Sequence, residues 1–333
     1  MITAVPVDFL EPALAAEVVD DLARVEEVLT STAHPDDELL TEASRHLIAA
    51  GGKRFRAMLV LLAARFGDPA DPRVIQAAVA IELTHLATLF HDDVMDEALV
   101  RRGSASVNSR WGNSVAILTG DFLFAQASQI LADLGPEAVR MQAKTFSRLV
   151  SGQMAETVGP HPDQDPLAFY MRVITEKTGS LIATSGQFGA LFSGAPGPLA
   201  DRIAVACEQL GVAWQLSDDV IDIASDPDQS GKTPGTDLRQ GVRTLPVLYA
   251  LGSVVQSPAD ARLRWLLTEA DLTDEVLLDE ALRLLRGHHA MKESRADVLH
   301  WVLGARSELM TLPDVPARAA FLALCDFVEK RTG

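Results

Sequence analysis

Helical periodicity is the feature of this sequence that most constrains its fold. Apolar residues recur three and four positions apart along almost the whole chain, and no run shows the sustained two-residue alternation of a β-strand. The pattern predicts helices at about 11–31, 36–50, 53–67, 73–97, 113–134, 136–158, 166–192, 198–225 and 241–253, followed by several shorter amphipathic helices. We therefore expect an all-α fold, a single large helical bundle around a central cavity, with residues 1–333 as one domain.

Composition narrows the classes of protein that fit. The chain has 333 residues, 48% of them hydrophobic, which is enough for a large core and excludes wholesale disorder. Its net charge of −17 argues against a nucleic-acid partner. Two cysteines are too few for a disulfide framework, the first residues show no signal-peptide pattern, and the longest apolar stretches are shorter than a membrane span. We expect a cytoplasmic protein without a transmembrane segment.

The strongest chemical signal is a pair of acidic clusters, DDVMD at 92–96 and DDVID at 218–222. Each follows an apolar run, and its first and last aspartates lie four residues apart on one helix face. Like charges at that spacing repel, and Mg²⁺ relieves the repulsion by binding one or two carboxylates together with water and phosphate oxygens. The candidate metal ligands are Asp92, Asp93, Asp96, Asp218, Asp219 and Asp222. Two solvated helix ends are the alternative interpretation.

Polar side chains extend each cluster along its predicted helix. His85 and Thr88 lie on the face of the first cluster, and Gln215 lies on the face of the second. Because the helices are otherwise apolar, we expect the two polar stripes to face each other across a cavity. A lone histidine on such a face is more often a buried, hydrogen-bonded residue than a ligand, so His85 gains weight only from its acidic neighbours.

Basic residues are few in this acidic chain, and they cluster. The segment KRFR at 53–56 follows a glycine pair, and Arg101 and Arg102 follow the first acidic cluster. A helix N-terminus binds anions through its unpaired N–H groups, and arginine forks suit a diphosphate. Either group of residues alone is common on surfaces. Together they indicate two anion subsites, one basic and one built from metal on carboxylates.

Other polar residues are weaker candidates by themselves. Gln153 and Glu156 lie in SGQMAE, and Lys177 and Thr178 lie in EKTGSL. Lys232 lies in a loop rich in glycine, proline and aspartate that we expect to cover a ligand. Each of these residues also has a solvent-exposed interpretation. The sequence contains no dinucleotide-binding, P-loop, zinc-spaced or serine-hydrolase motif.

A series of motifs spans most of the chain: GGKRFR (51–56), ELTHLATLFHDDVMDEALVRRG (82–103), GDFLFAQA (120–127), SGQMAE (151–156), EKTGSL (176–181), GVAWQLSDDVID (211–222) and SGKTPGTDLRQGVRTLP (230–246). In this order they resemble the all-trans polyprenyl diphosphate synthases, particularly actinobacterial long-chain members that make menaquinone side chains. Two DDxxD motifs joined to GGKRxR and RRG are highly specific for that family. The resemblance implies the type I isoprenoid synthase fold and a homodimer.

The resemblance also implies a reaction, the Mg²⁺-dependent 1′-4 condensation of isopentenyl diphosphate with an allylic diphosphate. About three Mg²⁺ ions and several basic residues would draw off the allylic diphosphate, and the isopentenyl double bond would attack the resulting carbocation before a proton is lost. The implied metal ligands are first Asp92, Asp96 and Asp218, with Asp93 and Asp222 assisting. The implied catalytic residues are Asp92, Asp96, Lys177, Thr178, Gln215, Asp218 and Lys232. The allylic diphosphate would bind Arg101, Lys177, Gln215 and Lys232, with the oxygens of Thr178 and Gln215 near the cation. Isopentenyl diphosphate would bind Lys53, Arg56, His85 and Arg102.

A few positions depart from the family pattern. Ala57 stands in place of a proline, and Trp214 stands in place of a phenylalanine. Val242 stands in place of a loop lysine, and the neighbouring Arg243 is the candidate substitute for the missing charge.

Small residues next to the first acidic cluster point to a long product. A growing prenyl chain must run from that cluster into the bundle, and Ala87 and Thr88 leave room where short-chain family members often carry an aromatic floor. Phe122 and Phe124 are candidate floors deeper in the shaft. Close helix packing is another reason for small residues here. We expect a long-chain product used for menaquinone or another isoprenoid quinone, and weak membrane association during its release.

Other functions stay open at this point. A geranylgeranyl or other medium-chain diphosphate synthase differs only in product length. A terpene cyclase shares the metal chemistry but needs no second diphosphate subsite. A phosphohydrolase of the HD type would use the pair at 91–92, yet it leaves two DDxxD clusters unexplained, and an inactive partner subunit tends to have lost such clusters.

Overall fold

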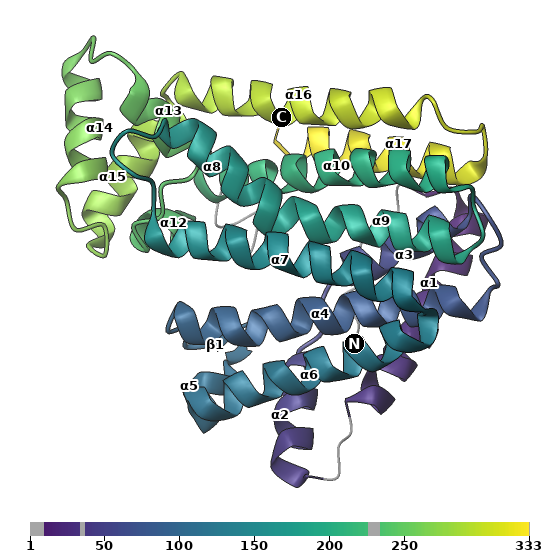
Figure 1. Ribbon diagram of the computed structural model, residues 1–333. Helices are drawn as coiled ribbons and strands as arrows, with labels where there is room; N and C mark the ends of the chain where they lie inside the picture. Colours follow the sequence, from purple (N-terminus) through teal and green to yellow (C-terminus); the bar gives the residue numbers. More distant parts are fainter. Residues whose placement is uncertain (1–9, 34–36, 226–233, 333) are drawn as a thin grey trace. The chain divides into compact units, whose positions relative to one another are not determined.

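The computed structural model describes residues 10–33, 37–225 and 234–332. Within these ranges the chain is almost entirely helical (Figure 1), as the sequence predicts. The α-helices are α1 (Pro12–Thr32), α2 (Glu38–Ala49), α3 (Phe55–Ala64), α4 (Pro72–Met95), α5 (Val107–Trp111), α6 (Asn113–Leu134), α7 (Pro136–Val158), α8 (Pro166–Ile174), α9 (Ser180–Phe192), α10 (Gly197–Ala224), α12 (Thr236–Arg239), α13 (Leu245–Gly252), α14 (Pro258–Thr268), α15 (Glu275–Arg286), α16 (Ala290–Leu309) and α17 (Pro316–Lys330).

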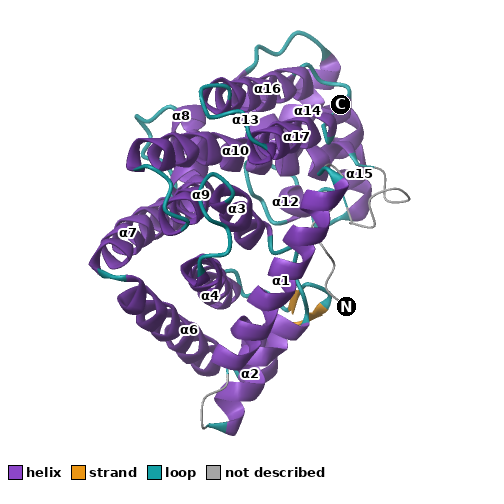
Figure 2. Ribbon diagram, turned by 90° about the vertical axis from the view of Figure 1, so that its right-hand side faces the viewer, coloured by secondary structure: helices purple, strands orange, loops and turns teal. Residues whose placement is uncertain are grey.

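Three further elements complete the described part of the chain. A π-helix, η1 (Thr175–Gly179), joins α8 to α9. Two short antiparallel strands, β1 (Val100–Arg101) and β2 (Ser104–Ala105), form a hairpin that appears in orange in Figure 2. The hairpin and α5 were not predicted, because two-residue strands and a five-residue helix are too short to show a period.

Most predicted helix boundaries are confirmed, and the differences have local causes. α3 begins at Phe55 rather than at 53, because Arg54 has a φ of +46°, a left-handed conformation that cannot belong to a helical turn. The predicted helix 166–192 is divided into α8, η1 and α9. α13 begins at Leu245 with Pro246 in its first turn, where the missing N–H of proline costs nothing.

The chain groups into two compact units. Unit 1 contains the residues up to 147 together with 181–207 and 308–323, and unit 2 contains 148–180, 208–307 and the residues from 324 onward. Each of the five divisions falls inside a continuous helix: 147/148 in α7, 180/181 in α9, 207/208 in α10, 307/308 in α16 and 323/324 in α17. We therefore keep the single-domain organisation of residues 1–333 as a proposal.

The helix α4 is the centre of unit 1. Nearly every side chain from Val74 to Phe90 is buried, and α1, α3 and α6 pack against this helix (Figure 1). Glycines allow the closest approaches between unit 1 helices. A Cβ atom on Gly120 of α6 would lie 2.4 Å from His91 Nε2, which no side chain could occupy without moving the histidine. A helix that is apolar on all faces occupies the central position that the sequence predicts for it.

Two helices of unit 1 are long and apolar enough to cross a membrane, judged by length and composition alone. The apolar window of α4 is 78% buried and that of α6 is 33% buried inside the fold. The core helix of a globular protein passes the same test, and α6 packs along α4. On its other side α6 exposes Ile117 and Leu118.

Unit 2 holds the later part of the chain. Leu210, Leu216 and Val220 of α10 are fully buried there. The pair α14 and α15 pack side by side, and an ion pair of 2.6 Å between Arg262 and Glu280 joins them (Figure 1). Several helices of unit 2 expose one polar face and bury one apolar face, as the sequence predicts for the last part of the chain.

Candidate active site

The first acidic motif lies at the C-terminal end of α4, where the chain leaves the core of unit 1. Asp93 is 2% exposed, whereas Asp96, the C-cap residue, is exposed. The guanidinium of Arg101 binds Asp93 Oδ1 through both Nη2, at 2.5 Å, and Nε, at 2.6 Å. Burial raises the pKa of Asp93, and the contact with Arg101 partly offsets the rise. Asp93 is therefore a fixed support inside the motif.

The hairpin after α4 turns Arg102 back toward the glycine pair at 51–52. Arg102 has a φ of +52° in the turn, a conformation that few residues other than glycine adopt. Its Nη1 donates to the carbonyl oxygens of Leu47, at 3.3 Å, and Gly51. A Cβ atom on Gly52 would lie 2.9 Å from the guanidinium carbon. The glycine pair thus ends α2, as predicted, and also makes room for Arg102.

Arg54 of the same basic motif has a structural role. It forms an ion pair of 2.7 Å with Glu26 and lies 3.7 Å from the buried carboxylate of Glu82. Glu82 also accepts a hydrogen bond of 3.1 Å from the N–H of Ala57 in the first turn of α3. The helix N-terminus that we considered as an anion site is therefore capped by a carboxylate of the protein. The other basic residues of this motif are Lys53, which is exposed, and Arg56, which is half-buried.

Four arginine charges act on His85. The pKa of His85 lies well below its ordinary value. Burial is the largest cause, and the positive charges of Arg56, Arg102, Arg54 and Arg101 lower the pKa further. His85 is therefore neutral near pH 7. Burial also lowers the pKa of Arg102 to about 10, so this guanidinium is still charged at neutral pH. Arg56 Nε is buried and has no hydrogen-bond partner within the described ranges. This basic cluster therefore contains a hydrogen-bond donor that no described protein group uses, and a diphosphate subsite requires such donors.

The second acidic motif lies in the last turns of α10, in unit 2. Its second aspartate, Asp219, is buried and accepts hydrogen bonds from the Tyr170 hydroxyl, from Gln215 Nε2 at 3.3 Å and from the Leu245 N–H at 3.3 Å. Burial raises the pKa of Asp219 to about 7, although the donors at Tyr170, Leu245 and Gln215 oppose the rise. Asp219 therefore ties α8, α10 and α13 together.

Protein groups also bind the outer aspartates of this motif. Arg331 contacts Asp218 Oδ1, and the side chain of Asp218 stays 35% exposed. The backbone N–H groups of Thr236 and Asp237 each lie 3.2 Å from one carboxylate oxygen of Asp222. Asp222 thereby anchors the start of α12, where the described chain resumes after the loop.

The first four residues of the motif EKTGSL lie in the π-helix η1, and the last two begin α9. Lys177 Nζ pairs with Glu156 of α7, and Thr178 Oγ1 donates to Gln215 Oε1 at 3.4 Å. A Cβ atom on Gly152 would lie 2.7 Å from the backbone nitrogen of Lys177, so this glycine of SGQMAE lets α7 approach η1. π-Helical turns occur frequently at functional sites. Within unit 2 the structure thus brings together SGQMAE, EKTGSL and the Gln215 end of the second acidic motif.

Some predicted residues take no place in these contacts. Lys232 lies outside the described residues. Arg243, the candidate substitute for the missing lysine, is exposed next to Val242. Within the described ranges no three His, Cys, Asp or Glu side chains converge as a ready-made metal site. Mg²⁺ needs only one or two carboxylates when phosphate oxygens and water complete its shell, so this absence is compatible with the predicted ligands.

Two of the residues predicted to set product length lie close to the first acidic motif. Ala87 is fully buried, and its carbonyl oxygen would lie 3.1 Å from a Cβ atom on Gly120 of α6. Phe124 of α6 contacts His91, with ring centroids 5.9 Å apart, and Phe146, at 4.4 Å. Phe124 therefore lies beside the residue that precedes the first acidic motif, and its role as a deeper floor stays a prediction.

The face of α4 below Thr88 carries buried polar side chains. Thr88 is buried and donates to the carbonyl of His85 at 2.8 Å. One turn further down, Thr84 accepts a hydrogen bond of 2.7 Å from Gln142 Nε2, and both side chains are buried. Phe122, the other candidate floor, is half-buried. Sequence reasoning missed Gln142, since a glutamine inside an amphipathic helix carries no signal of burial.

Comparison with known proteins identifies the family. The model for "Polyprenyl synthetase" matches residues 37–285. The chain belongs to the polyprenyl synthetase family. It is 47% identical to the nonaprenyl diphosphate synthase of Mycobacterium tuberculosis over 98% of this chain and 97% of that protein. It is 43% identical to a dimethylallyltranstransferase of the same organism, with 95% of each chain covered.

The solved structures of polyprenyl synthetases agree with this assignment. The geranylgeranyl pyrophosphate synthase from Corynebacterium glutamicum, complexed with calcium and isoprenyl diphosphate, matches with a TM-score of 0.87 and 45% identity, covering 97% of this chain and 98% of that chain. A decaprenyl diphosphate synthase from Rhodobacter capsulatus matches with a TM-score of 0.85 and 30% identity, covering 98% and 100%. The predicted family and the all-α isoprenoid synthase fold are both confirmed.

Proposed function

We infer that this polyprenyl synthetase is a prenyltransferase that joins isopentenyl diphosphate to an allylic diphosphate, head to tail, and produces an all-trans polyprenyl diphosphate. The observation that carries this inference is the basic cluster of unit 1, in which the charges of Arg56, Arg101 and Arg102 act on the buried His85, and Arg101 binds Asp93 of the first acidic motif. An enzyme with two diphosphate substrates needs one diphosphate subsite apart from its metal carboxylates. A terpene cyclase has no second diphosphate to place there.

The donor sets of the two acidic motifs fit a hard divalent cation. Each motif offers carboxylate oxygens at the end of a helix, and Asp96 and Asp218 keep exposed surface. We propose that Asp92, Asp96 and Asp218 are the main ligands of about three Mg²⁺ ions, with Asp222 assisting. When bound, the cations neutralise the charge that develops on the leaving diphosphate. Asp93 and Asp219 are buried and held by neighbouring donors, so we assign them a supporting role instead of direct ligation.

The basic residues divide between the two substrates. Lys53, Arg56 and Arg102 bind isopentenyl diphosphate, and the neutral His85 adds a hydrogen bond without adding charge. Arg101, Lys177 and Lys232 bind the allylic diphosphate. The oxygens of Thr178 and Gln215, 3.4 Å apart, present partial negative charge that stabilises the allylic cation. Both side chains are half-buried, and we propose that the bound substrates complete the exclusion of water from the cation.

The direct test is an incubation of the purified protein with Mg²⁺, labelled isopentenyl diphosphate and allylic primers of increasing length. We expect all-trans products longer than the primer, and none in the presence of excess chelator. Cyclised products from the allylic diphosphate alone would point to a cyclase. Phosphate release without formation of a carbon–carbon bond would point to a hydrolase.

We propose a long-chain product, since Ala87 and Thr88 provide no aromatic floor below the first motif. Ala87→Phe should shorten the product sharply and leave the first condensation intact, because the new ring fills space below the motif without touching its carboxylates. Ala259→Phe, at an exposed position of α14, is the matched control and should leave the product unchanged. If Ala87→Phe gave the parent's product at comparable activity, the small residues would serve only the close packing of α4 on α6.

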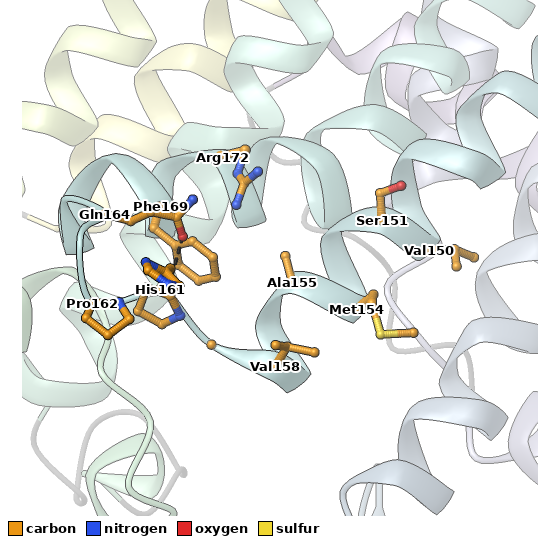
Figure 3. Close-up of a pocket in the computed structure, with 12 residues that line it drawn as sticks. Val150, Ser151, Met154, Ala155, Val158, His161, Pro162, Gln164, Phe169 and Arg172 are labelled. Carbon is orange, nitrogen blue, oxygen red and sulfur yellow. Dashed lines mark hydrogen bonds between the residues drawn. The ribbon is translucent and has the colours of Figure 1, made fainter.

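We also propose that the enzyme is a homodimer. Val150, Met154 and Val158 form an exposed apolar stripe along α7, at 44%, 61% and 75% exposure, which is unusual for a surface without a partner. With Phe169 of α8 they border an open groove of about 730 Å³ (Figure 3). A second copy of this chain is the occupant that we propose for this face. In sedimentation analysis Met154→Glu should weaken the dimer, whereas Leu303→Glu on exposed α16 should not. A monomeric parent protein contradicts the proposal.

The cellular role follows from the product that we propose. A long polyprenyl diphosphate suits the side chain of menaquinone or another isoprenoid quinone, and its apolar chain is poorly soluble in water. We propose a cytoplasmic enzyme that associates weakly with the membrane while it releases product. In co-sedimentation with phosphatidylcholine vesicles, product-loaded enzyme should bind more than the substrate-free enzyme, and equal binding argues against this step.

A further inference from the structure

Arg331, in the turn after α17, contacts the second acidic motif from far along the chain. Its Nη2 binds Asp218 Oδ1, and its Nη1 donates to Ser217 Oγ at 2.9 Å. The guanidinium carbon lies 4.1 Å from the centre of the Trp214 ring. Only 14% of the arginine side chain is exposed, whereas 35% of the Asp218 side chain is exposed. All of these residues belong to unit 2.

Several contacts that do not involve Asp218 hold Arg331 in place. The Trp214 ring, on which the guanidinium rests, stacks on Phe327 with centroids 6.1 Å apart. Beyond Arg331, Arg295 of α16 donates to the carbonyl of Thr332 at 2.6 Å and fixes the backbone. Tryptophan offers a cation a stronger ring face than phenylalanine does, and Trp214 is the position at which the family pattern has phenylalanine. The guanidinium of Arg331 is therefore held in position by contacts that do not depend on Asp218.

We propose that Arg331 is a positioning residue for Asp218, an inference that rests on the proposed role of Asp218 as a cation ligand. The guanidinium engages one carboxylate oxygen and so fixes the direction in which the rest of the carboxylate meets a divalent cation. Partners that orient a ligating carboxylate typically contribute about 10- to 100-fold to metal affinity. The alternative is that Arg331 only occupies the cation site and leaves when a cation binds. Such a residue would be weakly held, and the contacts made by Trp214, Ser217 and Arg295 argue against that alternative.

The test measures cation binding directly, with Mn²⁺ alone as the probe. Electron paramagnetic resonance of free Mn²⁺ during a titration gives the affinity of the substrate-free protein. We expect Arg331→Gln to weaken Mn²⁺ binding by about 10- to 100-fold and Arg331→Lys to weaken it less, because lysine keeps the charge but loses the fork. Trp214→Phe, which keeps a ring under the guanidinium, should cost only about threefold, as expected for a partly weakened cation–π contact.

Two controls separate the possible failures. Arg306→Gln removes another arginine that pairs with residues of α17, Asp326 and Glu329, without touching the acidic motif, and it should leave Mn²⁺ affinity unchanged. Asp218→Asn should weaken Mn²⁺ binding at least as much as Arg331→Gln. If Asp218→Asn binds Mn²⁺ normally, the proposed metal role fails and the positioning role fails with it. If Asp218→Asn is weakened but Arg331→Gln binds Mn²⁺ as well as or better than the parent, only the positioning role of Arg331 is overturned.

A kinetic readout distinguishes positioning from loss of structure. In Arg331→Gln the Mg²⁺ concentration for half-maximal activity should rise by about the same factor as the Mn²⁺ dissociation constant, while KM for isopentenyl diphosphate stays near that of the parent. Thermal unfolding without metal reports whether the variant folds. A variant with parental thermal stability, normal Mg²⁺ requirement and only a lower kcat overturns the proposal.

Discussion

The two acidic motifs share a sequence pattern, yet the fold supports them differently. In the first motif the second aspartate, Asp93, is bound by a guanidinium, and the last aspartate, Asp96, is exposed at the end of α4. In the second motif the second aspartate, Asp219, is bound mainly by neutral donors, and protein groups also engage Asp218 and Asp222. A repeated motif therefore does not imply repeated chemistry, since each carboxylate's surroundings decide its charge and freedom.

The difference has a physical consequence at neutral pH. A cation opposes the effect of burial on a carboxylate more strongly than neutral donors do, so a buried carboxylate with only neutral donors is closer to protonation at neutral pH. Burial accordingly raises the pKa of Asp219 to about 7, and for Asp93 the Arg101 contact opposes the rise caused by burial. The first motif thus keeps the charge of Asp93 and leaves Asp96 exposed, whereas all three aspartates of the second motif contact protein groups.

The largest effects should come from the outer aspartates of both motifs. Asp92→Ala, Asp96→Ala and Asp218→Ala should each reduce turnover by at least about 100-fold, because each removes a charge that orients the cations on the leaving group. Steady-state kinetics with labelled isopentenyl diphosphate measures the turnover. Asp133→Ala, at an exposed position of α6, is the control. Parental turnover in any of the three variants, or in excess chelator, would overturn the metal assignment.

The substrate preference of the basic residues should follow the two motifs. Arg102→Ala or His85→Ala, near the first motif, should raise KM for isopentenyl diphosphate more than for the allylic primer, and Lys177→Ala should do the reverse. A charge-assisted hydrogen bond is worth roughly 1.5–3 kcal/mol, or about 10- to 150-fold. Varying one substrate at saturating levels of the other separates the effects. Equal changes for both substrates would show that the basic residues are divided wrongly.

Removing the partners of the two middle aspartates should affect stability unequally. Arg101→Gln leaves Asp93 buried without its cation and should lower the free energy of unfolding by about 3 kcal/mol at pH 7. Tyr170→Phe removes one neutral donor from Asp219 and should cost about 1–2 kcal/mol, since that carboxyl can take up a proton instead. Urea denaturation at pH 7 and at pH 5.5 compares the loss in free energy of unfolding between the two variants. Equal costs at pH 7 would mean that the two supports are equivalent.

The smallest expected effect concerns His85. Its pKa in the folded protein is depressed, so below about pH 6.5 the unfolded chain takes up a proton that the folded protein refuses. This group therefore contributes nothing above pH 6.5 and destabilises the fold progressively as the pH falls, by at most about 1.4 kcal/mol per pH unit. His85→Asn should flatten the acid limb of stability measured by urea denaturation, and His300→Asn, at an exposed position, should not. An unchanged slope in His85→Asn would show that the folded histidine titrates normally.

Local pattern was sufficient for the helices and for the acidic motifs. The period of apolar residues predicts α4 and α10 because burying one apolar face per turn requires that spacing. The turn formed by the glycine pair at 51–52 was also predictable, since Gly51 has the positive φ that ends α2. The second glycine was not understood from sequence. Glycine is needed at position 52 because the guanidinium of Arg102, which comes from the hairpin, leaves no room for a Cβ atom.

Residues without a motif were invisible from sequence. Tyr170, Arg148 and Arg331 each bind an acidic residue of another helix: Tyr170 binds Asp219, Arg148 bridges Glu176 and Glu208, and Arg331 binds Asp218. Nothing in their local sequence distinguishes them from surface residues. Only folding brings their partners within hydrogen-bond distance.

The sequence by itself determined the helices, the family and which residue types could hold a cation or a diphosphate, because these depend on spacing along one chain. The tertiary structure decided which of those residues is buried and held by neighbouring donors and which keeps exposed surface. Asp93 and Asp219 look identical to their neighbours in the printed sequence, yet burial and a contact from another element fix them in place. Charge and accessibility depend on what surrounds a side chain in space, and a linear pattern does not contain that information.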